Sequence, residues 1–132
     1  MAELTEKCRA LIDAPNYAYL ATVDADGAPQ VSPVWIDRDG DTILVNTATG
    51  RVKDRNMRND PRVALSIADL ANPYKKSDIR GRVSDIVEGD EATAHIDKLA
   101  KKYTGADVYA GHNDKEDRVI FRIEPLRVTD RA

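Results

Sequence analysis

The chain opens with an amphipathic helical pattern. Within residues 2–13 the apolar side chains recur three or four positions apart, namely Leu4, Cys8, Leu11 and Ile12. This spacing places them on one face of a helix. Pro15 disfavours helical geometry at Ala14, so the helix is expected to end there.

Period-two patterns of apolar side chains follow. They predict strands over residues 17–23, 29–36 and 42–47. Turn sequences rich in Asp and Gly separate these segments, so we expect an antiparallel three-stranded meander. Both faces of the first strand carry apolar side chains, which indicates cover on both sides. Pro33 has no backbone N–H to donate, so the second strand is expected to be an edge, bulged or interrupted there.

The rest of the chain mixes helices and strands. The patterns predict helices over about 51–60 and 90–103, and strands over 62–68, 78–87 and 118–124. Pro125 is expected to break the last strand, with residues 126–129 continuing it past a bend. Gly81 lies inside a strand, which is typical of a bulge or of a close approach by a ligand. Together these elements predict an α+β fold in which six or seven mostly antiparallel strands form a small barrel, with an N-terminal helix and two short helical insertions.

Composition narrows the classes of function. The 132 residues contain no linker or low-complexity tract, which predicts a single domain over residues 1–132. Hydrophobic residues make up 42% and charged residues 33%, as in soluble globular proteins. A pI of about 5.4 and an aromatic content of 5% argue against a nucleic-acid-binding barrel. No apolar run reaches the roughly 18 residues of a membrane span, and the N-terminus lacks a signal-peptide pattern.

Positive charge is concentrated in the segment 50–62. Its basic residues are Arg51, Lys53, Arg55, Arg58 and Arg62, although the whole chain has a net charge of −3. A helix start normally attracts acidic groups, because its first N–H groups are unpaired and carry partial positive charge. Basic residues there indicate a bound anion, and phosphate is the usual one. The alternative is a solvated basic face. Thr49 is the expected N-cap of this helix.

The sequence offers no catalytic side-chain constellation. Cys8 is the only cysteine, so we expect no disulfide, no Cys-based metal site and a cytoplasmic location. His95 and His112 lack metal-ligand spacing, and His95 is expected on the surface of its helix. No nucleotide-binding glycine motif or nucleophile motif is present. If the protein is an enzyme, its chemistry is therefore expected to reside in a bound cofactor.

Three blocks of the sequence resemble the pyridoxamine 5′-phosphate oxidase-like split β-barrels. The first is Tyr19-Leu-Ala-Thr-Val-Asp-Ala-Asp-Gly-Ala-Pro-Gln-Val-Ser-Pro-Val-Trp35, similar to the hairpin A-T-x-x-x-D-G-x-P-x-x-x-P. The second is Gly50-Arg-Val-Lys-Asp-Arg-Asn-Met-Arg-Asn-Asp-Pro-Arg-Val-Ala-Leu65, similar to K-x-R-N-L-x-x-D-P-R with Met57 at the usual Leu position. The third, Asp78-Ile-Arg-Gly-Arg-Val83, fits the strand with the family's central glycine. The resemblance implies that the small barrel is a split β-barrel.

The resemblance also implies a cofactor and a reaction. The second block is similar to that of the F420 (deazaflavin)-dependent oxidoreductases, which move a hydride between reduced F420 and an unsaturated or otherwise electrophilic small molecule. FMN is the alternative cofactor within the same fold, and a cofactor-binding protein without turnover is a further alternative. The chain lacks the long C-terminal region in which pyridoxamine phosphate oxidases hold their substrate. Tyr74, His112 and solvent stay open as the proton donor.

Cofactor-binding residues carry over by position in these blocks. The resemblance implies that Arg51 and Lys53 bind the cofactor's phosphate and, in F420, its anionic tail, with Arg55 and Asn56 as further candidates on the same helix. The residues expected to line the ring or contact its polar atoms are Gln30, Val31, Ser32, Pro33, Asn46 and Thr47. No metal is expected.

Members of this family are homodimers that bind their cofactor between subunits, so the resemblance implies a homodimer here. Trp35, Tyr17 and the strands that are apolar on both faces fit this expectation. They offer more apolar surface than the inside of one small barrel needs, and exposed apolar surface marks an interface.

Overall fold

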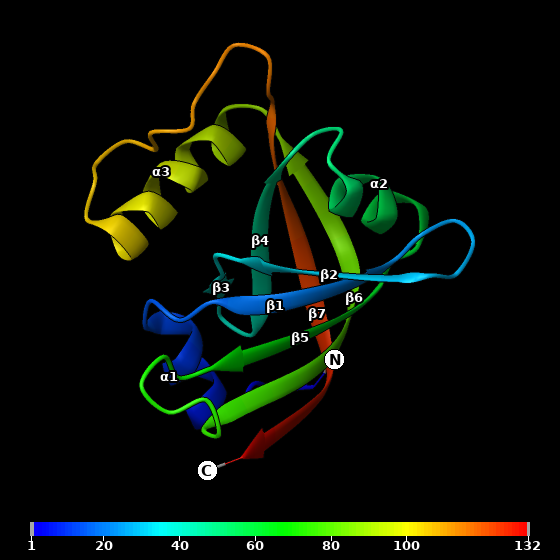
Figure 1. Ribbon diagram of the computed structural model, residues 1–132, viewed down its shortest axis with the longest axis vertical. Coiled ribbons are helices and arrows are strands. Elements are labelled where there is room, and N and C mark those ends of the chain that lie inside the picture. Colours follow the sequence, from blue (N-terminus) through cyan, green and yellow to red (C-terminus); the bar gives the residue numbers. More distant parts are fainter. Residues whose placement is uncertain (1, 132) are drawn as a thin grey trace.

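One antiparallel sheet of seven strands forms the body of the molecule. The computed structural model describes residues 2–131, and Figure 1 shows their arrangement. The strands are β1 (Ala18–Val23), β2 (Pro29–Val34), β3 (Asp37–Asp39), β4 (Thr42–Ala48), β5 (Arg62–Ala68), β6 (Lys76–Glu88) and β7 (Arg118–Arg131). Their order in the sheet is β2-β1-β5-β6-β7-β4-β3. The sheet curls without closing, since β2 and β3 remain edges, so the predicted α+β split barrel is confirmed.

The predicted three-stranded meander is wrong. β2 pairs only with β1, whereas β4 pairs with β7 and with the short β3. The chain therefore leaves one edge of the sheet after Val34 and enters the opposite edge at Asp37. Pro33 explains the edge position of β2, because an edge strand can spare one N–H donor. That part of the prediction is confirmed.

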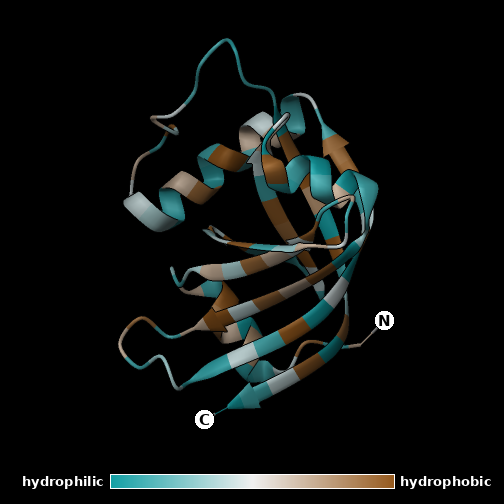
Figure 2. Cartoon of the chain, turned by 45° about the vertical axis from the view of Figure 1, so that its right-hand side comes forward, coloured by the Kyte–Doolittle hydropathy of each residue, from teal (hydrophilic) through white to brown (hydrophobic). Residues whose placement is uncertain are grey.

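The core lies on the concave side of the curled sheet. Phe121, Ile123 and Val45 are fully buried there, together with Ile12 of α1 (Glu6–Asp13) and Met57 of α2 (Val52–Asn59). Figure 2 shows the resulting alternation of brown and teal along the strands. The opposite side is open within this chain. Three large apolar side chains are exposed there: Tyr19 is 51% exposed, Val31 63% and Leu126 52%. The expectation that the first strand is covered on both faces therefore fails within one chain.

A bulge lets the long strands β6 and β7 bend through both halves of the sheet. The register shifts between Arg80 and Gly81, and Gly81 pairs with Pro125. A Cβ atom at Gly81 would lie 2.7 Å from Ile123 Cγ2 and 3.2 Å from the Glu124 carbonyl oxygen. The glycine thus serves the close approach of a neighbouring strand. Pro125 sits inside β7 and does not end it, because the bulge accommodates the missing N–H donor.

The first two helices begin differently, and only the first has a side-chain N-cap. α1 starts later than predicted, at Thr5, whose Oγ1 accepts a hydrogen bond from Cys8 N at 3.0 Å. In α2 the N-cap is Arg51, and Asp54 Oδ2 accepts a hydrogen bond from Gly50 N at 2.8 Å. Thr49 is therefore not the cap of α2. None of the helices within residues 2–131 is long and apolar enough to span a membrane.

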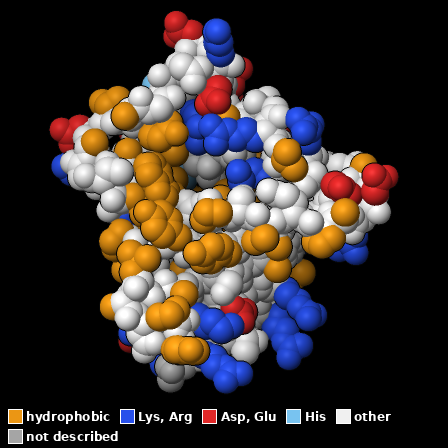
Figure 3. Space-filling view, in the orientation of Figure 1, with side chains coloured by type: hydrophobic (Ala, Val, Ile, Leu, Met, Phe, Trp, Pro, Cys, Tyr) orange, Lys and Arg blue, Asp and Glu red, His pale blue; other side chains and the backbone are white. Residues whose placement is uncertain are grey.

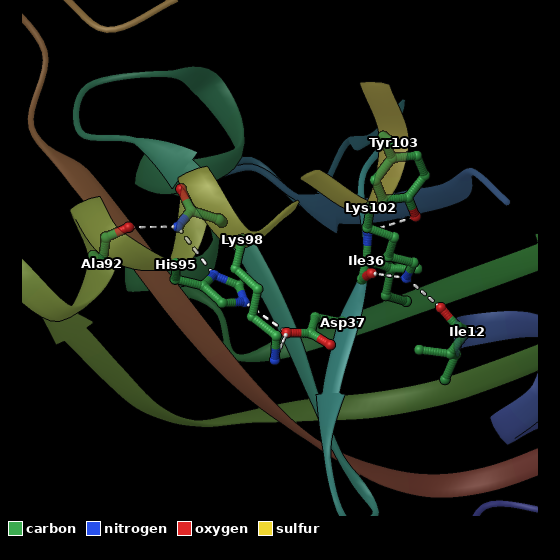
Figure 4. Close-up of polar contacts among 9 residues, drawn as sticks. Ile12, Ile36, Asp37, Ala92, His95, Lys98, Lys102 and Tyr103 are labelled. Atoms are coloured by element: carbon green, nitrogen blue, oxygen red, sulfur yellow. Dashed lines mark hydrogen bonds and ion pairs between the residues drawn. The ribbon is translucent and has the colours of Figure 1, made fainter. Parts of the chain in front are cut away.

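The third helix is α3 (Asp90–Thr104). Polar side chains at its C-terminal end form hydrogen bonds to the backbone of the N-terminal part of the chain. Lys102 Nζ donates to the carbonyl oxygens of Ile12 and Ile36, the latter at 2.6 Å. The Tyr103 hydroxyl donates to Asn16 O at 2.6 Å. It accepts from Ile36 N at 3.0 Å (Figure 4). Burial lowers the pKa of Lys102 and raises the pKa of Tyr103 to about 12. These contacts hold α3 beside the link from β2 to β3, where it forms one wall of a cavity.

Candidate functional site

A cavity of about 230 Å³ opens where α2 begins, between the ends of β2 and β4 and the start of β7. Its lining residues come from both halves of the chain: Tyr17, Pro33, Val34, Trp35, Asn46, Thr47, Arg51, Lys53, Ile96, Tyr109 and Arg118. Figure 3 shows a hollow in the upper half of the molecule with blue basic side chains around it. Larger troughs of about 510 Å³ each lie on the open side of the sheet, but mostly apolar side chains and β-strand backbone line them.

The cavity is strongly electropositive. Arg51, Lys53 and Arg118 line it, and no Asp or Glu does. Lys53 is half-buried and has no acidic partner among residues 2–131. Burial, with repulsion from Arg51 and Arg118, lowers the pKa of Lys53. Arg51 lies 3.4 Å from Glu116 at the exposed rim, where an ion pair contributes little. This charge cluster suits an anionic ligand.

Arg118 is the most buried cation of the cavity, at 7% exposure. Its Nε donates to Asn46 Oδ1 at 2.9 Å, and its guanidinium carbon lies 5.3 Å from the centre of the Tyr109 ring. Its Nη1 is buried and has no hydrogen-bond partner in the described chain. The nearest carboxylate oxygen of Glu116 is 3.9 Å from Nη1, too far for a hydrogen bond. Burial lowers the pKa of Arg118. Arginine nevertheless stays protonated in proteins, so this buried guanidinium keeps its charge and can donate to an acceptor.

The sequence patterns did not predict Arg118 as a site residue. It stands at the start of a strand, where an arginine carries no local signal. Its pairing with Ala48 of β4 brings it beside the beginning of α2. Only this long-range register joins it to Arg51 and Lys53.

The other basic residues of segment 50–62 are satisfied elsewhere. Arg58 contacts Asp54 at 2.8 Å and Glu88 at 2.6 Å. Arg62 forms an ion pair with Asp60 at 2.7 Å. Arg55 Nη1 donates to Gly50 O at 2.6 Å. These contacts leave Arg51 and Lys53 as the residues of this segment that face the cavity.

The predicted ring-contacting residues divide into two groups. Pro33, Asn46 and Thr47 line the cavity, and Thr47 Oγ1 is buried without a hydrogen-bond partner among residues 2–131. Val31 lies instead in the trough on the open side of the sheet. Ser32 Oγ is buried and also lacks a partner in the described part of the chain. Neither Val31 nor Ser32 lines the cavity.

Gln30 and Asn56 also lie away from the cavity. Asn56 is buried and donates to Thr22 Oγ1 at 3.0 Å. Thr22 Oγ1 in turn donates to Gln30 Oε1 at 3.2 Å. This chain of hydrogen bonds holds α2 against the β1–β2 hairpin. Both residues therefore fix the position of α2 and do not line the cavity.

Aromatic side chains form one wall of the cavity. Trp35 and Tyr103 stack with ring centres 5.1 Å apart and planes 5° apart, and Tyr17 stacks on Tyr103 at 5.8 Å. Tyr109 meets Trp35 edge-on at 5.9 Å. Hydrophobic side chains form an orange band beside the hollow in Figure 3. A cationic cavity next to flat aromatic surface suits a ligand with a phosphate and a planar ring.

The expectation that His95 lies on the surface is wrong. It is only 9% exposed, with Nε2 3.0 Å from Asp37 Oδ2 and Nδ1 3.1 Å from Asn46 Nδ2 (Figure 4). A polar residue can be buried when it is hydrogen-bonded, and the partners come from distant strands that the helical pattern does not reveal. His112 lies in the loop after α3, 2.7 Å from Asp97. Within residues 2–131 no cluster of His, Cys, Asp and Glu suits a metal ion.

Comparisons with known proteins show the family and the fold of this chain. A family model described as pyridoxamine 5′-phosphate oxidase matches residues 4–132. Among solved structures, an F420 reductase is 37% identical with a TM-score of 0.83, covering 96% of this chain and 98% of that one. A conserved hypothetical protein from Mycobacterium tuberculosis is 24% identical with a TM-score of 0.74, covering 95% and 82%. A putative pyridoxamine 5′-phosphate oxidase from Listeria innocua is 20% identical with a TM-score of 0.70, covering 92% of each. The last two support the fold alone.

Proposed function

Because this chain belongs to the pyridoxamine 5′-phosphate oxidase family, we propose that it is an oxidoreductase that uses the deazaflavin coenzyme F420. It transfers a hydride between reduced F420 and a small unsaturated or otherwise electrophilic organic substrate. One observation carries this proposal. Arg51, Lys53 and Arg118 meet in a cavity without carboxylates beside an aromatic wall, in a chain 37% identical to an F420 reductase over nearly its whole length.

The residues present fit an anionic, phosphorylated cofactor. Arg118 Nη1 and Thr47 Oγ1 are buried polar atoms without partners among residues 2–131, and such atoms usually indicate a missing ligand or water. Arg51 and Lys53 would hold the phosphate and the anionic tail, since guanidinium groups bind phosphate oxygens in pairs and an ammonium binds as a point charge.

The bound deazaflavin supplies the hydride-carrying ring, so the protein needs no nucleophile of its own. The chain's residues bind and orient. Arg51 and Lys53 would fix the charged end, whereas the Trp35 and Tyr109 rings add aromatic surface to the lining and limit the access of water. Positioning of this kind, together with exclusion of water, is the protein's main contribution to such a reaction.

A second copy of the chain would complete the site. The cavity of about 230 Å³ is smaller than the roughly 300–1,000 Å³ typical of ligand pockets, so it holds only part of a cofactor. Tyr19, Val31 and Leu126 leave an apolar sheet face open beside it. Exposed apolar surface of this kind favours an interface, and we therefore include a homodimer in the proposal.

FMN is the second candidate cofactor. The family description names a pyridoxamine 5′-phosphate oxidase, and the cationic cavity suits the terminal phosphate of FMN as well as that of F420. The purified protein distinguishes the two. A yellow preparation with a flavin spectrum favours FMN, and its absence together with F420 binding favours the deazaflavin.

Turnover tests the proposed reaction. Reduced F420 is mixed anaerobically with the protein and a panel of quinones and α,β-unsaturated carbonyl compounds, and the return of the oxidised deazaflavin absorbance is followed. We expect at least one acceptor to reoxidise the cofactor faster than the protein-free control. Tight F420 binding without reoxidation by any acceptor would instead indicate a cofactor carrier.

A further inference from the structure

A continuous chain of hydrogen bonds runs from the cavity to the edge strand β3. Arg118 Nε donates to Asn46 Oδ1 at 2.9 Å. Asn46 Nδ2 lies 3.1 Å from His95 Nδ1, and His95 Nε2 lies 3.0 Å from Asp37 Oδ2 (Figure 4). The chain thus links β7, β4, α3 and β3 in sequence, and all four side chains are largely buried.

The direction of every hydrogen bond in this chain is determined. The Asn46 oxygen must face Arg118, because a guanidinium only donates. Its amide nitrogen then donates to Ala92 O at 2.9 Å and to His95 Nδ1. His95 Nδ1 must therefore accept, so the ring proton sits on Nε2 and is donated to Asp37.

Asp37 selects that tautomer. Burial alone would raise the pKa of its carboxyl, but hydrogen bonds from His95, from the Arg38 backbone and from Lys98 outweigh it and hold the pKa well below the usual range. The side chain thus remains a carboxylate, which can only accept hydrogen bonds. With an acceptor on one side and the Asn46 amide on the other, only the Nε2-protonated ring satisfies both neighbours.

We propose that Asp37 and His95 are positioning residues for a phosphoryl-binding site in which Arg118 is the innermost ligand. They hold the Asn46 amide in one orientation, and that amide holds the guanidinium by Nε, so that its remaining N–H groups are free to bind the anion. The ligand class follows from the charge cluster: a phosphoryl group can accept from Arg118 while Arg51 and Lys53 balance its charge. The identification of this group with the cofactor's phosphate rests on the proposed function.

If the network served only to pack α3 onto the sheet, the hydrogen bonding of Arg118 would be different. It would give Arg118 full hydrogen bonding, because an unpaired buried charge destabilises the fold. Here Nη1 remains without a hydrogen-bond acceptor within residues 2–131. The network also holds Arg118 by Nε alone, which leaves the N–H groups of Nη1 available to an oxyanion.

Two substitutions of His95 separate positioning from packing. In His95→Asn the side-chain oxygen can replace Nδ1 and accept from Asn46. In His95→Gln the amide reaches the place of Nε2 and keeps the contact with Asp37, but nothing accepts from Asn46. Inorganic phosphate and F420 are titrated into each variant, and the Arg118 Nε–H resonance is followed by nitrogen-15 NMR.

We expect His95→Asn to bind both ligands close to the wild-type affinity, and His95→Gln to bind about tenfold more weakly, the effect of losing one hydrogen bond. The Arg118 Nε–H resonance should stay protected from exchange with water in the first variant and lose that protection in the second. Equal effects of the two substitutions on affinity and on this resonance would overturn the proposal.

A double-mutant cycle tests the part played by Asp37. Asp37→Ala should weaken phosphate binding in the wild-type background and shift the His95 tautomer seen by NMR. The same substitution should have no further effect in the His95→Asn background, where no tautomer exists. Asp39→Ala is the matched control, since Asp39 lies on the same strand and pairs with Arg122 at 3.1 Å. An equal loss from Asp37→Ala in both backgrounds would contradict tautomer selection.

The outcomes also separate this inference from the proposed function. Phosphate binding that follows the predicted variant order, without F420 or FMN binding, would leave the positioning chain standing and remove the cofactor assignment. F420 binding that is identical in both His95 variants would support the cofactor assignment and remove the positioning role of His95.

Discussion

The partner of each basic side chain decides its role in this protein. Arg58 and Arg62 both lie in segment 50–62, and each contacts a carboxylate within 2.8 Å. Lys53 is half-buried beside Arg51 and Arg118 and has no such partner among the described residues. Basic residues therefore form structural ion pairs at some positions and remain available to a ligand at others, and sequence alone could rank them only by resemblance.

The lowered pKa of Lys53 predicts a pH dependence of ligand binding. A bound anion favours the charged ammonium, whereas the empty cavity disfavours it. F420 affinity should therefore fall as the pH rises through the lowered pKa of Lys53, below the ordinary value of 10.5. In Lys53→Arg this decline should be absent, because arginine stays protonated. Calorimetric titrations between pH 7 and about 10 measure it, and a parallel decline in both proteins would assign the effect to another group.

The lowered pKa of Lys53 also predicts that the stability of the unliganded protein rises with pH, opposite to the F420 affinity. Because the pKa of Lys53 is lowered on folding, the unfolded state binds more protons in the window between the two pKa values. The unfavourable contribution of Lys53 to stability is thus fully present below its folded-state pKa and is lost as the pH rises from there to the ordinary value of 10.5.

At the scale of secondary structure, the bulge of β6 depends on one missing side chain. Gly81→Ala would place a Cβ atom 2.7 Å from Ile123 Cγ2 and 3.2 Å from a backbone oxygen. Overpacking of this kind typically destabilises a core by about 1–3 kcal/mol. We expect a loss of that size in urea unfolding. Ser84→Ala, at an exposed position of the same strand, is the control, and an unchanged unfolding midpoint for Gly81→Ala would contradict the steric explanation.

Most elements of the fold could be predicted from local patterns, whereas their pairing could not. The helix starts moved by only a few residues, and Pro33 correctly indicated an edge strand. The passage of the chain from β2 to β3 across the sheet was missed, since tight turns normally join neighbouring strands. The same long-range pairing puts Arg118 next to α2 and buries His95. The site residues that local patterns did not predict are those whose partners lie far away in the sequence.

At the scale of the whole molecule, the open sheet face predicts a homodimer. Val31→Glu would place a charge at the centre of this apolar surface, where it would be buried in a dimer. We expect the wild type to have the mass of a dimer in light scattering coupled to gel filtration, and the variant that of a monomer. Val108→Glu is the matched control, because Val108 is 62% exposed in the loop after α3 and Val31 is 63% exposed.

Two results would count against this interface. A monomeric wild-type protein would remove it outright. Dimers of equal stability in the wild type and in Val31→Glu would place the contact on another surface. Loss of F420 affinity together with loss of the dimer would support a cofactor groove shared between subunits.

The proposal that F420 binds in the electropositive cavity is most directly tested by fluorescence anisotropy. F420 is titrated with the wild type, Arg51→Ala, Lys53→Ala and the exposed-charge control Arg62→Ala. We predict saturable binding by the wild type and by Arg62→Ala, and a weakening of about 1–3 kcal/mol for each of the other two, the scale of a lost charged hydrogen bond. No change in anisotropy with the wild type, or equal affinities for all four proteins, would contradict the assignment of this cavity as the cofactor site.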